Sequence, residues 1–355
     1  MGAVVATLVL ACGTSLAAYS LYSAPAGAAA ALCAALRQQD YAKAYATLSS
    51  GAKSAIAADQ FVSAIQSLDQ IQGKVTSCGT GSLVGGYQYY FGSSATVTAT
   101  ISRAGGASLK GGLTVIRQAG EWKIDHLDAS LFGINLLALT TVTKYCIALQ
   151  GQDYTGLFAL LDSKALAGAT AATFAQVSQW HDIVDGQVQS CAVTHLGQGD
   201  SEAAASVTLS VNRQKLGAKQ GALTLDIERG AWKVSGVDTR LQGTNVTPLL
   251  TATHFCQDIS GQQYADLPTV LDANAANAYP GQSLANLFNG VDTGLKWTSC
   301  LIDPTTYQLS GTGASVAAGF VLADFHGTAV GHGSVVIGLV VVSGKWEVDN
   351  WSVQA

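Results

Sequence analysis

Apolar residues recur along this chain in one order that is repeated three times, first at helical spacing and then at strand spacing. Each copy opens with a cysteine and an aliphatic residue three positions later, which places both on one face of a predicted helix. A tyrosine eight positions after the cysteine begins a second short helix. Because these tyrosines recur in every copy, we interpret them as packing residues; they are Tyr41, Tyr154 and Tyr264.

A third helix is predicted in each copy, around residues 58–71, 172–184 and 283–291. Phe61, Phe174 and Phe288 are its expected apolar anchors. Glycine followed by Val and Thr then indicates that the helix stops and a strand starts.

The second half of each copy has the pattern of β-strands, with alternating or β-branched runs at residues 95–101, 205–211 and 334–340. A Gly-x-Trp sequence marks the closing strand, in which the glycine makes a hairpin turn and the tryptophan begins an alternating run. These tryptophans are Trp122, Trp232 and Trp346. Helices followed by antiparallel strands predict an α+β fold, with a curved sheet wrapped around the helices.

The copies repeat about every 110 residues, whereas solenoid repeats run only about 20 to 50 residues. The period therefore indicates three tandem domains. We expect them at residues 27–132, 138–242 and 248–355, after an N-terminal segment of residues 1–26. The linkers between them are short.

Six of the seven cysteines form pairs with separations of 45, 45 and 44 positions. Pairs at one fixed separation are typical of disulfides in an oxidising compartment, and each would tie the first helix of a copy to its first strand. Buried free thiols are the alternative interpretation. Zinc is less favoured, because Cys-x-x-Cys spacing is missing. The pairs are Cys33 with Cys78, Cys146 with Cys191, and Cys256 with Cys300.

Each copy resembles the nuclear transport factor 2-like superfamily of cystatin-like α+β cones, through its order of helices and sheet and its terminal Gly-x-Trp strand. More narrowly, it is similar to exported bacterial domains of that superfamily, whose first helix carries an Ala-Leu…Asp-Tyr pattern. The resemblance covers about residues 28 to 355. It implies that a pocket could lie inside a cone, and it transfers no catalytic residue.

Residues 3–23 are apolar or small throughout, about the 20 residues that a membrane-spanning helix requires. Three interpretations stay open: an uncleaved anchor, a lipoprotein signal with Cys12 as the lipid-bearing residue, and a secretory peptide cut after Ala26. No Lys or Arg precedes the apolar run, which a true start upstream of Met1 would explain. All three predict a protein outside the cytoplasm, anchored in the membrane or secreted.

Composition excludes some function classes. With 48% hydrophobic residues the chain has material for its cores, and with a net charge of −5 and 18 Lys and Arg it has little to neutralise phosphates. Nucleic acid is therefore an unexpected partner. No phosphate-binding loop, dinucleotide fingerprint or nucleophile elbow occurs, so we expect no cofactor.

Polar residues that differ among the copies are the candidates for a site. The middle copy carries His181, Asp182 and Asp185 near His195, enough for a general acid and base if they converge. On a helix, His181 and Asp185 would share one face. The alternative interpretation is that these polar residues form a solvated helix face without a functional role.

The other copies offer weaker candidates, each explained equally well as polar or packing surface. They are Asp324, His326 and His332 in the third copy, and His126 between Asp125 and Asp128 in the first, with the aromatic run at residues 87–91 as a surface for a glycan or peptide.

We predict a noncatalytic, membrane-tethered extracytoplasmic protein whose three domains act as a spacer or binding array, because the copies share packing residues and no reactive set. Its ligand would be a protein, peptide or glycan. The alternatives are an isomerase-like or dehydratase-like pocket in the middle domain, and the ectodomain of a signalling protein truncated at its N-terminus.

Overall fold

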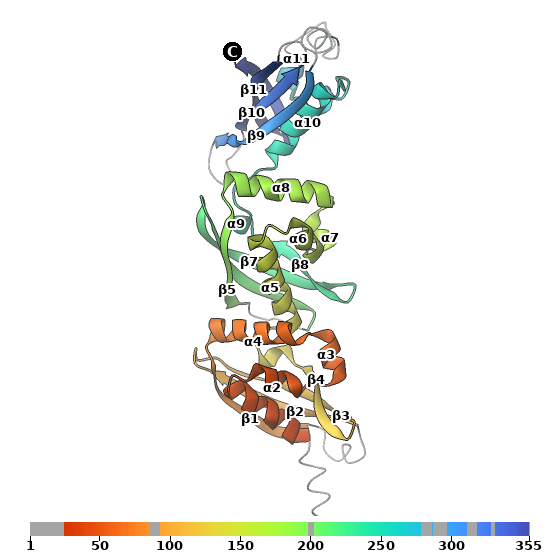
Figure 1. Ribbon diagram of the computed structural model, residues 1–355, viewed down its shortest axis with the longest axis vertical. Coiled ribbons are helices and arrows are strands. Elements are labelled where there is room, and N and C mark those ends of the chain that lie inside the picture. The colour runs from red at the N-terminus through yellow and green to blue at the C-terminus, as the bar shows by residue number, and fades with distance from the viewer. Residues whose placement is uncertain are drawn as a thin grey trace, which may run out of the picture. The chain divides into compact units, whose positions relative to one another are not determined.

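The computed structural model describes residues 25–84, 93–197, 202–277, 286, 297–310, 318–327 and 331–354. Within them lie three four-stranded antiparallel sheets, each preceded by helices, which confirms the α+β prediction (Figure 1). The chain forms two compact units, which are taken separately below. The first comprises residues 1–169, 189–212 and 218–241, and the second comprises 170–188, 213–217 and 242–355.

The first unit begins with helical residues 25–37 and three further helices, which precede a sheet whose strands lie in chain order. The helices are α2 (Tyr41–Ala46), α3 (Ser50–Ala55) and α4 (Ala58–Gln72). The strands are β1 (Val75–Val84), β2 (Ser94–Arg103), β3 (Ser108–Gln118) and β4 (Glu121–Leu127), followed by the 3₁₀ helix η2 (Ala129–Leu131).

The second sheet repeats this order. Its helices are α5 (Leu136–Gln150), α6 (Tyr154–Leu160), α7 (Ser163–Leu166) and α8 (Ala171–Val184), of which α8 belongs to the second unit. Its strands are β5 (Val188–Leu196), β6 (Ala204–Arg213), β7 (Gly217–Glu228) and β8 (Ala231–Val237).

The third sheet lies in the second unit. After α9 (Thr239–Gln242), the helices are α10 (Pro248–Ser260), η3 (Leu267–Thr269) and α11 (Ala273–Asn277). The strands are β9 (Trp297–Ser310), β10 (Ala318–Gly327), β11 (Gly331–Val342) and β12 (Lys345–Gln354).

The recurring tyrosine starts a helix in the first two copies, as predicted, because an aspartate precedes it. Asp40 and Asp153 accept hydrogen bonds from backbone N–H groups three residues on and so cap α2 and α6. In the third copy Gln263 takes the place of the aspartate. There the chain makes a turn and then η3, and Tyr264 is buried.

The third helix is present as α4 and α8, but its anchors differ between copies. Phe61 is fully buried on α4, whereas Phe174 on α8 is only half-buried and Trp180 is the buried aromatic residue there. Apart from Asn286, the predicted helix at 283–291 lies outside the described residues, as do Phe288, Cys12 and the aromatic run at 87–91.

All three closing hairpins have two-residue turns in which both residues have positive φ, the geometry of a type I′ turn. Their second residue is the predicted glycine, with φ of 85° at Gly120, 81° at Gly230 and 82° at Gly344. The tryptophans that follow lie on β4, β8 and β12; Trp232 is buried, and Trp122 and Trp346 are half-buried.

Each copy contains one disulfide, which joins its two cysteines. Each links the first helix of a copy to its first strand, with Cα–Cα distances of 5.1, 5.3 and 5.4 Å, within the usual range for disulfides. They are Cys33–Cys78, Cys146–Cys191 and Cys256–Cys300. Such bonds persist in oxidising compartments, which supports an extracytoplasmic location.

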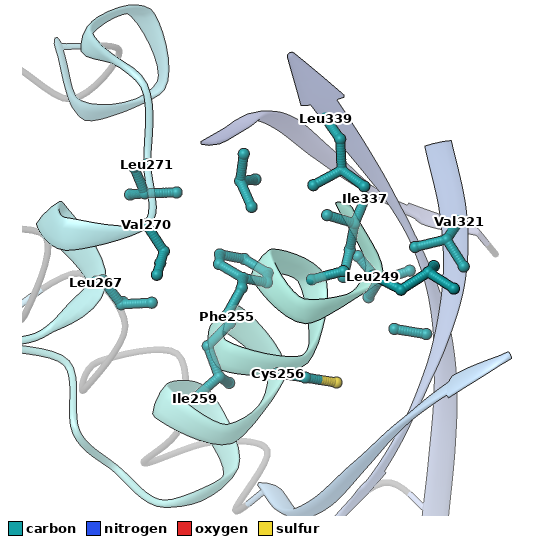
Figure 2. Close-up of a cluster of buried hydrophobic side chains, with 14 of the residues drawn as sticks. Leu249, Phe255, Cys256, Ile259, Leu267, Val270, Leu271, Val321, Ile337 and Leu339 are labelled. Carbon is teal, nitrogen blue, oxygen red and sulfur yellow. The ribbon is translucent and has the colours of Figure 1, made fainter. Parts of the chain in front are cut away.

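The hydrophobic core of each copy lies between the first helix and one face of the sheet. In the third copy, Phe255 on α10 faces Ile337 and Leu339 of the sheet (Figure 2). Trp180 of α8 belongs to the same cluster, so the third helix of the middle copy packs in the core of the next one. No helix among the described residues is long and apolar enough to span a membrane, and residues 3–23 lie outside them.

Candidate functional site

Asp182, the first candidate, lies on α8 in a buried ion pair. Arg213, at the end of β6, donates from Nη1 to Asp182 Oδ1 at 3.0 Å and to the carbonyl of Gly186 at 3.3 Å. Only 9% of the Asp182 side chain and 7% of the Arg213 side chain is exposed. The pair therefore fastens the end of α8 to the end of a strand.

The first copy contains the same arrangement. Arg103, at the end of β2, donates to Asp69 of α4 and to the carbonyl of Gly73, the residue after that helix. The Tyr41 hydroxyl also donates to Asp69. Burial, together with this hydrogen bond, raises the pKa of Tyr41 to about 12. Because it recurs, we interpret the Asp–Arg pair as part of the shared scaffold.

His181 of α8 and Asp185, the C-cap residue of that helix, lie side by side as the sequence predicts, with Nδ1 and Oδ2 3.4 Å apart. The buried Asp185 carboxylate also accepts hydrogen bonds from the Thr244 amide at 3.0 Å and the Thr244 hydroxyl at 2.5 Å. Burial alone would raise the pKa of Asp185, but the hydrogen bonds from His181 and Thr244 outweigh it and hold the pKa below its ordinary value. Asp185 thus fixes the linker before α10.

His195, the last member of the predicted middle-copy site, is exposed on β5 in the first unit. One ring nitrogen lies 3.2 Å from the hydroxyl of Thr194. His181 and Asp182 belong to the second unit, where each has the structural contacts described above. His181 and Asp182 thus contribute to contacts within the second unit, and His195 is exposed on the first.

The candidates of the first copy also make structural contacts. Asp125 accepts from the Ser49 hydroxyl at 2.5 Å, and Asp128 caps η2. His126 Nε2 lies 3.6 Å from Oε1 of Glu202, a residue shortly before β6 in the second sheet.

Glu202 ties the first linker to the second copy. Its two carboxylate oxygens accept from the amide of Ala129 at 2.8 Å and from the side-chain amide of Asn135 at 2.9 Å. Both linkers are therefore held by a carboxylate, Glu202 in the first unit and Asp185 in the second.

In the third copy, Asp324 accepts from the Ser334 hydroxyl at 2.7 Å and His326 is exposed at the end of β10. The backbone of His332 pairs with that of His326 across the hairpin, and the His332 side chain lies outside the described part. Among the residues that the structure describes, no three His, Cys, Asp or Glu side chains gather as a metal site.

A small groove lies between α4 and α5 of the first unit, with a volume of about 160 Å³. Its lining mixes an acid, a base and small polar groups with one aliphatic side chain: Asp59, Gln60, Ser63, Thr140, Thr143, Lys144 and Ile147. Ile147 is 63% exposed. Sequence reasoning missed this groove, because it forms where two copies meet.

The residues that organise these contacts were also missed. Arg103 and Arg213 each end a strand, and Asp69 and Asp182 each stand four positions before a helix-ending glycine. Comparing the copies position by position at the strand ends would have revealed the pairs. Glu202 and Thr244 make contacts between distant segments, for which the sequence gives no local signal.

Comparison with known proteins adds no family. No protein-family model matches the chain, and a search of curated proteins finds no similar sequence.

Proposed function

We propose that this chain is a noncatalytic, membrane-tethered extracytoplasmic protein whose three domains act as a spacer or binding array. The observation that carries the proposal is the recurrence of the Asp182–Arg213 pair as Asp69–Arg103. A catalytic residue would be expected to differ between copies, and this carboxylate serves the same structural contact in both. Three disulfides and carboxylate-held linkers suit a chain that has to keep its shape outside the cell.

We further assign each domain to the cones of the nuclear transport factor 2-like superfamily. The order of helices and sheet and the type I′ hairpin before each tryptophan support this assignment. A membrane tether rests on the apolar residues 3–23. Protein, peptide and glycan stay the expected ligand classes.

An enzymatic pocket in the middle domain has less support. His181 and Asp185 have the geometry of an acid–base pair, but Asp185 already accepts two hydrogen bonds from Thr244.

The test is to incubate the full chain with small hydrophobic carbonyl, hydroxyl and epoxide compounds and to follow them by mass spectrometry. We expect no turnover by the wild type or by His181→Gln. Turnover by the wild type that is lost in His181→Gln would overturn the proposal. A membrane-impermeant amine reagent, applied to intact cells, should label a chain that sediments with the membranes.

A further inference from the structure

The third sheet has an outer face that points away from its helices, and strand pairing defines which residues lie on it. On β10 buried residues alternate with residues of this outer face. Residues that pair directly across antiparallel strands point to the same face, so the partners of the outer residues belong to it as well. The outer face includes Leu301, Asp303, Phe320, Leu322, Asp324 and Val336, which we call the acidic apolar face.

Apolar side chains and carboxylates alternate on the acidic apolar face. Leu322 lies directly opposite Asp303, and Leu301 lies directly opposite Asp324. Leu301 is 63% exposed and Phe320 is 43% exposed. Single exposed apolar residues need no explanation, but adjacent ones on matched strands are typical of an interaction surface.

The two carboxylates of this face are oriented by hydrogen bonds but not neutralised. Asp303 accepts from the amide of Thr305 at 3.0 Å and from its hydroxyl at 2.6 Å. Asp324 accepts from the Ser334 hydroxyl at 2.7 Å. Among the residues that the structure describes, no Lys or Arg forms an ion pair with either carboxylate. Both are therefore available to cations from outside the chain.

Comparison with the first sheet shows that the acidic charge is particular to the third. The two sheets are aligned through the strand positions opposite their disulfide cysteines. Lys110 and Lys123 lie on the outer face of the first sheet. Ser334 takes the place of Lys110 in the strand pairing. Glu347 takes the place of Lys123 after the closing tryptophan. On the outer face of the third sheet, Lys345 is the one Lys or Arg among the described residues.

The third copy is also acidic as a whole. Residues 248–355 contain eight Asp and Glu and two Lys, whereas residues 27–132 contain six Asp and Glu and eight Lys and Arg. A charge distribution of this sign attracts cationic partners and repels anionic ones before contact. The charge of the acidic apolar face thus agrees with that of its surroundings.

We propose that the acidic apolar face binds a basic amphipathic segment of a partner protein, in which apolar residues alternate with Lys or Arg. The apolar residues of the segment cover Phe320 and Leu322. Its cations pair with Asp303 and Asp324, which gives the contact its specificity. This inference rests on the binding role in the proposed function and gives that role a site and a class of partner.

Charge separates this partner from the other occupants of such a face. A second copy would bring the same carboxylates and a single lysine, so most of the acidic groups would face no cation. Anionic lipid and nucleic acid would be repelled in the same way. Among the described residues no three acidic, His or Cys side chains gather as a metal site. A basic amphipathic segment satisfies both the apolar and the acidic residues.

The test is the fluorescence anisotropy of a labelled peptide of about ten residues, the length of β10, in which Leu alternates with Lys. The purified full chain, with its disulfides intact, should bind this peptide saturably and less tightly as salt is added. Asp303→Asn with Asp324→Asn should raise the Kd at least about tenfold, and asparagine keeps the hydrogen-bond acceptors that these positions use. Phe320→Thr with Leu322→Thr should also raise the Kd at least about tenfold.

The matched control is Asp258→Asn with Asp266→Asn, which removes two carboxylates of the same copy from α10 and from the residue before η3. It should leave the Kd unchanged, because neither residue lies on the sheet. A second peptide, in which Leu alternates with Glu, should not bind.

Four results would overturn the proposal: a wild type that does not bind the Leu–Lys peptide, an equal loss of binding in the control, equal binding of the Leu–Glu peptide, or displacement of the peptide by phosphatidylcholine vesicles. A wild type that dimerises in sedimentation velocity, and loses the dimer in Phe320→Thr with Leu322→Thr, would assign the face to a second copy instead. Turnover of a small substrate would overturn the proposed function, and the peptide measurement does not depend on that result.

Discussion

The first two copies and the third stabilise the end of the second strand of their sheets in different ways. Where Arg103 and Arg213 end the second strand, the third copy has Gly327. Opposite Arg103 lies Val75, and opposite Gly327 lies Trp297, whose ring is 5.3 Å from that of Phe325. In the first copy the large residue of this pair, Arg103, stands on the second strand; in the third copy the large residue, Trp297, stands on the first strand. Buried ion pairs can be replaced by apolar packing without loss of stability, so the fold requires this place to be filled and does not require a charge there.

The same comparison separates scaffold from specialised surface. Features present in every copy, such as the disulfides and the hairpin glycines, hold the fold. The third copy differs from the first at equivalent positions of the second strand, where Phe320 and Leu322 stand in place of Thr96 and Thr98.

Removing a disulfide should have the largest effect, and the effect should be alike in all three copies. Closing a loop of about 45 residues contributes about 4 kcal/mol in the chain-entropy model. The separations of 45, 45 and 44 positions then predict nearly equal losses. Denaturant unfolding of the three double Cys→Ala variants, followed by tryptophan fluorescence, checks this. A loss confined to one copy would show that the copies are not equivalent scaffolds.

The second linker should be sensitive to acid, because the Asp185 carboxylate holds it. Thr244→Val removes the hydroxyl that donates a hydrogen bond to the buried Asp185 carboxylate. The change should lower the free energy of unfolding by about 1–3 kcal/mol.

The lowered pKa of Asp185 determines how the stability of the fold changes with pH. A carboxylate whose pKa is lower in the folded state stabilises above its ordinary pKa of about 4, and the contribution is lost as the pH falls through the folded value. Denaturant unfolding between pH 7 and pH 3 should show the advantage of the wild type over Asp185→Asn constant above about pH 5 and decreasing as the pH falls below about 4. An advantage that grows as the pH falls would contradict this account.

Glycine substitutions after the first helices should have the smallest effect. Gln39, Gln152 and Gln262 have φ of 57°, 57° and 58°, a left-handed conformation that disfavours residues with a side chain. Replacing each by Gly should stabilise the chain by about 0.5–1 kcal/mol, since glycine adopts this conformation without steric cost. The expected result is a small rise in the unfolding midpoint for all three. A decrease at any of them would mean that the glutamine side chain stabilises its turn.

The sequence allowed the α+β order, the hairpin glycines and the helical partnership of His181 with Asp185 to be predicted, because each depends on local spacing. Trp180 could not be predicted as a core residue of the next copy, since its partners lie in another repeat. Glu202 and Thr244 were missed for the same reason. The domain boundaries, the membrane segment and the ligand stay predictions.

The most direct test of the central claim, that Asp182 is a structural residue, is the free energy of unfolding of Arg213→Leu and of Arg213→Leu with Asp182→Leu. We predict that the single change costs about 3–5 kcal/mol, because it leaves a buried carboxylate unpaired, and that the double change restores most of the loss. Arg103→Leu, alone and with Asp69→Leu, should behave alike. If Arg213→Leu were neutral or stabilising while the first-copy variant was not, Asp182 would be held at a cost to stability, as functional residues are, and the account would be contradicted.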